Sequence, residues 1–219
     1  MLTLLVVSEH RGELGVKLGG IIEQMSGISV HDGWSTYRKF EVLHALCNCH
    51  HIRELVAVNE LDGEPWAGEM IALLLRMLRS VERAHAKNST SLPKQTLTQY
   101  ATKYDNLIRQ ARILHPPRPP GRRVKRPKAA NLLDRLDIHR EDILRFTHNF
   151  DVPFTNNQAE RDLRMLKVKQ NVSGEFRSPN GASDHAIIRS VISTALKQGQ
   201  DVIDVLQRAL AGNHWHPAT

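Results

Sequence analysis

ISVHDGWSTYRKFEVLHALC, residues 28–47, holds two short apolar runs separated by polar and turn-forming residues. The first run predicts a strand over Ile28–His31, which places Asp32 at the carboxyl end of that strand. The second predicts a strand over about Val42–Cys47, which leads into a helix from about His50. An aspartate followed by glycine is most often only a turn, so this position alone does not identify a site.

The residues before this stretch predict one more strand and a helix. Thr3–Val7 is a continuous apolar and β-branched run, which we interpret as a buried strand. Apolar residues then recur with a helical period, at Leu14, Leu18, Ile21, Ile22 and Met25. The order of strand, helix, strand, strand and helix indicates a mixed α/β sheet.

Beyond residue 65 the pattern changes to long amphipathic helices. One apolar face recurs at Trp66, Met70, Leu73, Leu74, Met77 and Val81. A polar loop, Lys87–Ser91, precedes a second helical stretch over about Leu92–Leu114, and a further helix is expected over about Leu132–Phe150. The sequence therefore predicts a helical insertion, Trp66–Phe150, that splits a small α/β core.

Residues 115–128, HPPRPPGRRVKRPK, form a proline- and arginine-rich segment within this insertion. The prolines exclude helix and favour extended geometry, and the basic side chains repel one another. A solvated connector and an arm that contacts DNA are equally consistent with this composition.

The last part of the chain predicts two helices with defined ends. The first has an apolar face made of Ile187, Ile188, Val191, Ile192 and Ala195. Gly199 is a candidate C-cap for it, and Asp201 is a candidate N-cap for a final helix that runs through Leu210.

Composition limits the classes of partner and compartment. The net charge of +7 and the pI near 9.7 favour an acidic partner, of which nucleic acid is the first candidate. No apolar run reaches the roughly 18 residues of a membrane span, and we interpret Met1–Gly12 as containing a strand and not a signal peptide. Cys47 and Cys49 lie too close for an ordinary structural disulfide, which indicates a reducing, cytoplasmic setting.

The run Asn156–Lys169, NNQAERDLRMLKVK, predicts a helix that carries one acid among several bases. Asn157 followed by Glu160 has the spacing of a capping box. Glu160, Arg164 and Lys167 share one face, and the apolar stripe consists of Ala159, Leu163 and Leu166. On spacing alone, a glutamate that caps its helix and pairs with an arginine is favoured over a metal-binding acid beside a nucleic-acid site.

Two long segments resemble transposases of the IS66 insertion-sequence family. VPFTNNQAERDLRMLKVKQNVSGEFRSPNGA, residues 152–182, is similar to the region around the last catalytic acid of that family. VHDGW with Tyr37 (from residue 30) and HALCNCHHIREL (residues 44–55) resemble the region around its second acid. The similarity runs in matching order from roughly Arg11 to Gly212.

This resemblance implies a ribonuclease-H-like core and a DDE site. Asp32 and Glu160 would be the second and third catalytic acids and would bind a pair of Mg²⁺ or Mn²⁺ ions for DNA cleavage and joining. The implied parts are residues 1–65 and 151–219 for the core, with the helical insertion at 66–150. Such acids are expected to meet above the carboxyl edge of the sheet.

The sequence departs from the family at its beginning. In the family, the first Asp lies on an opening strand, and a second strand follows before the segment that resembles Thr3–Val7; no residue in Met1–Glu9 matches that Asp. Two acids bind a metal pair more weakly than three, so we expect impaired catalysis. Without the two strands we also expect unpaired sheet edges, with poor stability, rearrangement or association through those edges.

Further residues near the two acids are candidates for binding roles. The set expected to contact phosphates is Arg161, Arg164, Lys167, Lys169 and Arg177, with a solvated helix face as the alternative. The resemblance covers Cys47-x-x-His50, so His50 is expected to support the acids without binding metal itself, although plain packing is as well supported. A zinc site in the cluster from Cys47 to His51 is disfavoured, because a second ligand pair is missing. Trp34 and Tyr37 would either stack on an unpaired base or, more commonly for such a pair, pack in the core.

Three functions are consistent with these sequence features. The first is a metal-dependent IS66-like transposase acting on transposon ends and target DNA. The second is a non-catalytic DNA-binding or interfering protein, which would self-associate or pair with an intact transposase. The third, a structure-selective nuclease on the same fold, is less favoured because the matching motifs are specific.

Overall fold

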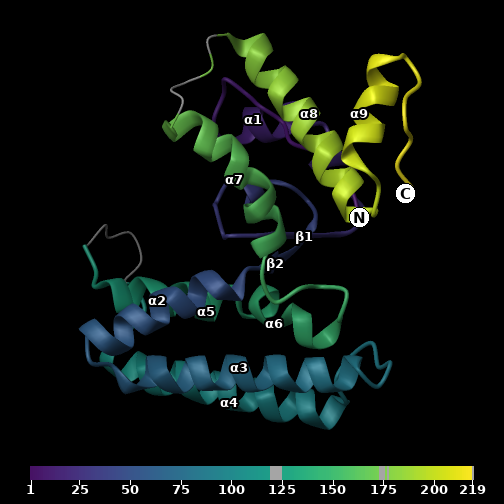
Figure 1. Cartoon of the computed structure of the whole chain (residues 1–219). Helices are drawn as coiled ribbons and strands as arrows, with labels where there is room; N and C mark the ends of the chain where they lie inside the picture. The colour runs from purple at the N-terminus through teal and green to yellow at the C-terminus, as the bar shows by residue number, and fades with distance from the viewer. Residues whose placement is uncertain (119–124, 173–175, 177, 219) are drawn as a thin grey trace. The chain divides into compact units, whose positions relative to one another are not determined.

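The computed structural model describes residues 1–118, 125–172, 176 and 178–218. The chain divides into two compact units, one made of Met1–Gln24 with Asn157–Thr219 and the other of Met25–Asn156. Most described residues are helical, and the strands form one small parallel sheet (Figure 1). This composition agrees with a mixed α/β class, while the ribonuclease-H-like core and the domain boundaries stay predictions.

The sheet lies in the unit of residues 25–156 and consists of β1 (Ile28–His31) and β2 (Leu43–Leu46). The strands are parallel, and their register pairs Ile28 with Leu43 and His31 with Leu46. Both strands were predicted from their apolar runs, and both predictions are confirmed. Gly33, with φ of 93°, turns the chain sharply after β1, a conformation that favours glycine.

Five helices complete this unit: α2 (Asn48–Leu61), α3 (Pro65–His85), α4 (Lys94–Leu114), α5 (Lys128–Ile138) and α6 (Arg140–His148). The two long amphipathic helices are confirmed, as is the polar loop between them. The single helix predicted over Leu132–Phe150 is wrong, because the chain breaks at His139, which caps both α5 and α6. The break lets two short helices turn separate apolar faces toward the same core.

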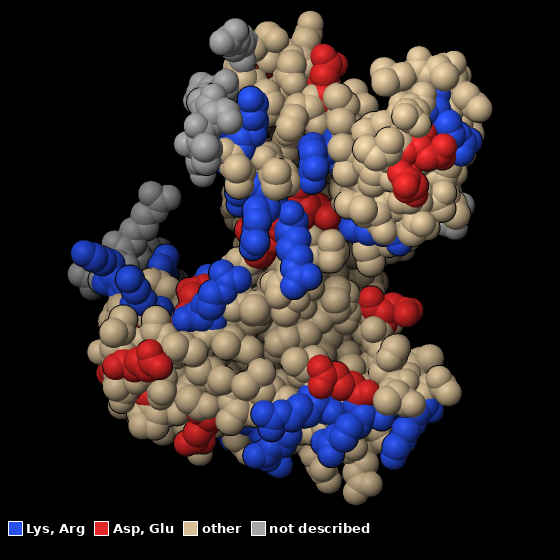
Figure 2. Space-filling view, in the orientation of Figure 1, with Lys and Arg blue, Asp and Glu red and all other residues tan. Residues whose placement is uncertain are grey.

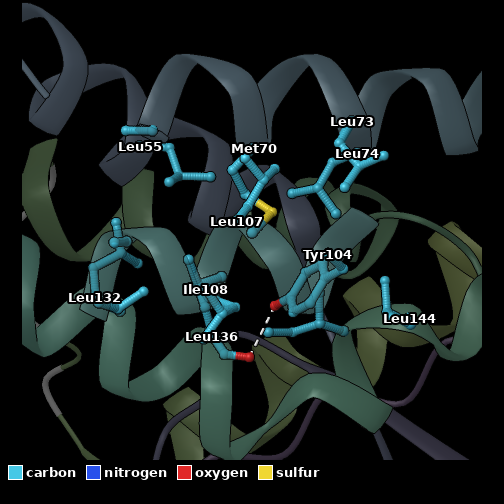
Figure 3. Close-up of a cluster of buried hydrophobic side chains, with 14 of the residues drawn as sticks. Leu55, Met70, Leu73, Leu74, Tyr104, Leu107, Ile108, Leu132, Leu136 and Leu144 are labelled. Atoms are coloured by element: carbon cyan, nitrogen blue, oxygen red, sulfur yellow. Dashed lines mark hydrogen bonds between the residues drawn. The ribbon is translucent and has the colours of Figure 1, made fainter. Parts of the chain in front are cut away.

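The core of this unit lies between the long helices and the shorter ones (Figure 3). Leu55 from α2, Met70 and Leu74 from α3, and Leu136 from α5 are completely buried there. Tyr104 of α4 is also completely buried, and its hydroxyl donates a 2.8 Å hydrogen bond to the Leu136 carbonyl. Each fully buried side chain of this size stabilises the fold by about 1.5–3 kcal/mol relative to exposure.

The other unit contains α1 (Glu13–Leu18), a short 3₁₀ turn at Ile22–Gln24, α7 (Asn157–Val172), α8 (Pro179–Lys197) and α9 (Val202–Leu210). The helical period predicted between Leu14 and Met25 is therefore interrupted. The interruption falls at Gly20, where φ is +68°.

The strand predicted at Thr3–Val7 is wrong. No described strand pairs with this extended segment; instead the Thr3 and Leu5 amides donate to the Thr194 and Ser190 hydroxyls of α8, at 3.0 and 2.8 Å. Only Leu5 of the run is buried, and the side chains on either side of it are exposed. Hydroxyls of a helix thus take the place of a neighbouring strand for these alternate backbone donors.

Helix α8 has the predicted carboxyl end but only part of the predicted inward face. Gly199 has φ of 66° and the Gln200 amide donates to the Ala195 carbonyl at 2.9 Å, which is a Schellman C-cap. Asp201 accepts from the Ile203 and Asp204 amides and caps α9, as predicted. The expected apolar face is confirmed only in part: Ala195 is buried and Val191 and Ile192 are half-buried, but Ile187 and Ile188 are exposed. The other buried residues of the helix are small, namely Ala182, Ala186, Ser190, Ser193 and Thr194. No described helix is both long and apolar enough to cross a membrane.

Candidate functional site

The carboxyl edge of the sheet brings together the end of β1 and the start of α2. The Cys47 amide donates to the His31 carbonyl at 2.9 Å, and α2 begins at the next residue, Asn48. Because the strands are parallel, Asp32 after β1 lies at the same edge as the amino terminus of α2. Open α/β sheets place their sites at such an edge.

Asp32 is exposed and forms a tight turn beyond β1. Its Oδ1 accepts a 3.0 Å hydrogen bond from the Trp34 amide. Its other carboxylate oxygen has no hydrogen bond or ion pair to any residue that the structure describes. One oxygen thus shapes the turn while the second remains accessible, and a carboxylate oxygen is the ligand type that Mg²⁺ and Mn²⁺ prefer.

Two histidines behind Asp32 hold this turn. The Gly33 amide donates to His31 Nδ1 at 3.0 Å, and His31 Nε2 lies 3.1 Å from His44 Nδ1. Since Nδ1 accepts, a neutral His31 carries its proton on Nε2 and donates it to His44. Burial, followed by the nearby His44 and Arg38 charges, lowers the pKa of His31 to about 4 and keeps it neutral.

An ion-pair network supports the same edge from α6. Asp142 accepts from Arg38 at 2.5 Å and from Arg145 at 2.9 Å, and Arg145 Nε also donates to the His44 carbonyl at 2.6 Å. Burial opposes ionisation of Asp142, but the hydrogen bonds from the two arginines outweigh it and lower the pKa of its carboxyl group. The network thereby ties β2 and the turn at residues 37–39 to α6.

Aromatic side chains cover the exposed side of this turn. Trp34 is 44 % exposed, and its ring lies edge-on to Tyr37 with centroids 5.7 Å apart. Tyr37 in turn lies 4.8 Å from the His31 ring. Tyr37 is half-buried, so packing accounts for its position, whereas an exposed Trp34 face next to Asp32 is available for stacking.

The segment before α7 is anchored to the start of α2. The Asn48 amide donates to the Phe154 carbonyl at 3.0 Å, and the Asn156 amide donates to Cys47 Sγ at 3.3 Å. Cys47 is buried, Cys49 is half-buried, and both thiols are free. These contacts give Cys47 a packing role, which the sequence left open.

His50 lies half-buried in the first turn of α2, where its amide donates to the Cys47 carbonyl at 3.2 Å. It therefore occupies the same sheet edge as the start of α2. The supporting role suggested for His50 stays a prediction.

Helix α7 carries Glu160 and most of the predicted phosphate-contacting set. Glu160 is half-buried in the first turn, while Arg161, Arg164 and Lys167 are exposed. Lys169 is half-buried and shares a face with Asp162 and Leu166, at spacings of three and four residues. Arg177 lies outside the described residues.

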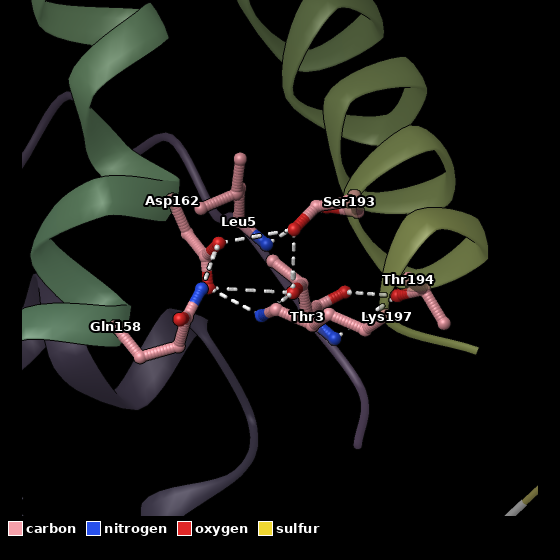
Figure 4. Close-up of polar contacts among 8 residues, drawn as sticks. Thr3, Leu5, Gln158, Asp162, Ser193, Thr194 and Lys197 are labelled. Atoms are coloured by element: carbon pink, nitrogen blue, oxygen red, sulfur yellow. Dashed lines mark hydrogen bonds and ion pairs between the residues drawn. The ribbon is translucent and has the colours of Figure 1, made fainter. Parts of the chain in front are cut away.

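The apolar stripe predicted for α7 is not its inward face. Ala159 and Leu163 are exposed, Leu163 by 41 %, and of the stripe only Leu166 is half-buried. A polar contact replaces the expected apolar one. Asp162 accepts from Ser193 Oγ at 3.0 Å, from Gln158 at 3.2 Å and from Lys197 Nζ at 2.5 Å (Figure 4).

Sequence reasoning missed the histidine pair and the two ion-pair networks. His31 and His44 offered a weak signal, because the strand register places them diagonally on one face of the sheet. The contacts of Asp142 with Arg38 and of Asp162 with Lys197 join residues far apart in sequence and had no local signal. Asp32 and His50 belong to the unit of residues 25–156, and Glu160 with the α7 bases belongs to the other unit.

Comparison with known proteins adds one match. The family model described as "Transposase IS66 family" matches residues 2–184, a span that includes Asp32, His50 and Glu160. No curated protein and no solved structure matches the chain significantly.

Proposed function

The chain belongs to the IS66 transposase family, and on that premise we propose that it acts in metal-dependent DNA cleavage and strand transfer, on a ribonuclease-H-like core. In this proposal Asp32 and Glu160 are two acids of a DDE site. The observation that carries it is the family match across residues 2–184, a span that includes both of these residues.

The placement of Asp32 supports the proposal. Its accessible carboxylate oxygen lies at the carboxyl edge of a parallel sheet, and the turn that presents it is held by hydrogen bonds to Trp34 and Gly33. When bound there, a Mg²⁺ or Mn²⁺ pair would supply Lewis-acid activation of the attacking hydroxyl and stabilise the leaving oxygen. The proposal requires the two units to bring Asp32 and Glu160 to one metal pair.

The remaining residues act on the substrate or on the acids. Arg161, Arg164, Lys167, Lys169 and Arg177 would hold the DNA backbone, each through a salt-dependent contact that reads no sequence. His50 would orient the acids from the first turn of α2. The resemblance assigns two acids of the triad to residues of this sequence, Asp32 and Glu160.

A second candidate is DNA binding without catalysis. The exposed bases of α7 support it, because electrostatic contact with phosphates needs neither acid. Under this alternative the protein would occupy DNA ends or associate with an intact transposase.

Nicking of supercoiled plasmid in Mg²⁺ or Mn²⁺ tests the proposal. Asp32→Asn and Glu160→Gln are each expected to abolish nicking and to leave DNA affinity at low salt within about twofold of wild type. Asp62→Asn, at an exposed acid after α2, is the matched control and should nick as wild type does. Binding of Mn²⁺ followed by calorimetry should weaken in Asp32→Asn and not in the control.

The outcomes separate the two candidates. DNA binding with no nicking by the wild-type protein favours the non-catalytic candidate. Nicking that persists in both acid variants would reject Asp32 and Glu160 as catalytic acids, and absence of both nicking and DNA binding at low salt would reject both candidates.

A further inference from the structure

Helix α3 presents a row of arginines that the fold does not neutralise. Arg76, Arg79 and Arg83 follow one another at spacings of three and four residues, and all three are exposed. None forms an ion pair with a residue that the structure describes. Along the helix they span roughly 10 Å on one side.

Other arginines of this unit do pair with acids, on the side of the shorter helices. Arg112 pairs with Asp134 at 2.5 Å and with Asp137 at 2.6 Å, and Arg140 pairs with Asp105 at 2.6 Å. Asp134 and Asp137 of α5 and Asp105 of α4 therefore neutralise arginines on the side of α5 and α6. The outer surface over α3 and α4 keeps an excess of bases, which Figure 2 shows as Lys and Arg side chains gathered there.

Neutral oxygen atoms hold one of these arginines in place. Arg83 Nε donates to the Arg79 carbonyl at 3.1 Å, and its Nη2 lies 3.4 Å from the Ser80 hydroxyl. Ser80 is itself 2.7 Å from the Tyr100 hydroxyl of α4. These contacts orient the guanidinium without cancelling its charge, which lowers the entropy lost when it contacts an anion.

A groove between α3 and α4 extends the same charged surface. It has a volume of about 350 Å³, and Arg76 from α3 and Lys103 from α4 both line it, with Glu69 as its one acid. Asn106 and Gln110 supply amide donors along its α4 wall. Ala72, Leu73 and Leu107 complete the lining, so the two cations and two amides stand around an otherwise apolar groove, where they can donate hydrogen bonds to phosphate oxygens.

We propose that this basic face, defined as Arg76, Arg79, Arg83 and Lys103, binds the phosphate backbone of duplex DNA as a second contact surface besides α7. The inference rests on the proposed function, from which it takes DNA as the binding partner. It adds a second DNA-binding surface, in the unit of residues 25–156. Because the face consists of arginines and one lysine that contact phosphates, it would increase affinity and position the DNA without reading its sequence.

The test measures DNA affinity as a function of salt. A duplex of about 30 base pairs with arbitrary sequence is titrated by fluorescence anisotropy, and the slope of log K against log salt counts the phosphate contacts. The combined variant Arg76→Gln, Arg79→Gln and Arg83→Gln is expected to reduce the slope by about 2 to 3 and to weaken binding at least about tenfold near 100 mM salt.

A matched control removes the same charge elsewhere. The control variant also lowers the net charge by three, through Lys17→Gln, Arg135→Gln and Arg208→Gln. Each of these side chains is at least 41 % exposed and already pairs with an acid: Lys17 with Glu13, Arg135 with Glu54 and Arg208 with Asp204. This control is expected to change the slope by less than about 0.5, because its cations are neutralised in the fold. If the triple variant does not fold by circular dichroism, Arg79→Gln alone is used, with an expected slope change of about one.

Equal slopes for the triple variant and the control would overturn the inference. If Arg164→Gln with Lys167→Gln weakens binding while the triple variant does not, only the second surface fails and the proposed function stands. If the wild-type protein shows no salt-sensitive DNA binding, both fail. Polyglutamate that binds through the same three arginines more tightly than the duplex does at equal salt would assign the face to an acidic protein segment instead.

Discussion

Lys197 Nζ of α8 lies 2.5 Å from Asp162 Oδ2 of α7, and the two side chains are 14 % and 13 % exposed. Ser193 and Gln158 donate to the other carboxylate oxygen, and the Lys197 ammonium also contacts the Thr3 hydroxyl. One carboxylate thus joins α7, α8 and the extended amino-terminal segment (Figure 4). Burial opposes its ionisation, yet the hydrogen bonds from Lys197 and Ser193 prevail and lower the pKa of Asp162.

Breaking this pair should destabilise the unit that carries Glu160. Asp162→Asn and Lys197→Met are each expected to cost about 1–3 kcal/mol, because each leaves a partly buried charge without its partner. The double variant should cost less than the sum of the two, with a coupling energy above about 1 kcal/mol. Urea unfolding of the four proteins measures this coupling.

The exposed pair Arg208–Asp204 provides the comparison. Its atoms are 3.7 Å apart and its side chains are 41 % and 62 % exposed, so its coupling energy should stay below about 0.5 kcal/mol. Equal coupling in the two cycles would mean that the Asp162 contact does not fix α7 against α8.

Local pattern was sufficient for the elements whose apolar residues are buried. The strands at Ile28–His31 and Leu43–Leu46 and the helices α3 and α4 follow from periodicity, and the caps at Gly199 and Asp201 follow from turn chemistry. In each case the residues that predict the element also make its contacts.

The hydrophobic pattern predicted the wrong structure for segments whose conformation depends on contacts with distant residues. Thr3–Val7 has the composition of a strand, but its amides bond to hydroxyls of α8, and no local residue reveals that choice. Helix α8 buries serine and threonine because those hydroxyls serve the extended segment, which leaves Ile187 and Ile188 exposed. At the candidate site, the sequence identified Asp32 through resemblance but not the histidines and arginines that support it.

His51 predicts how stability depends on pH. It is buried in α2, its Nδ1 has no hydrogen-bond partner among described residues, and burial, followed by the charges of Arg135, His50 and His139, lowers its pKa to about 4. In the unfolded chain the imidazole of His51 binds a proton near pH 6.5. The free energy of unfolding is therefore unaffected by this group above that pH and decreases as the pH falls from about 6.5 toward 4.

The variant His51→Leu isolates this contribution. Unfolding free energies from urea titrations at several pH values should fall less steeply below pH 6.5 in the variant, by roughly 2–3 kcal/mol in total. His214→Leu, at an exposed histidine, should leave the wild-type slope unchanged. Parallel curves for wild type and His51→Leu would show that His51 is not held neutral in the fold.

Tyr104 offers a test of the helical core. Its hydroxyl is buried and donates to the Leu136 carbonyl, which lies in the last turn of α5, where carbonyls lack an intrahelical partner. Burial, the largest influence, raises the pKa of Tyr104, so the hydroxyl keeps its proton and its hydrogen bond while the protein is folded. Tyr104→Phe removes the donor without opening a large cavity and leaves that carbonyl buried and unpaired. A loss of about 1–2 kcal/mol in unfolding free energy is expected, with an unchanged dependence on urea.

Tyr100→Phe removes a hydroxyl that contacts half-buried Ser80 at 2.7 Å, and it should cost less than half as much because water replaces that contact. If the two variants lose equal stability, the end of α5 does not depend on Tyr104.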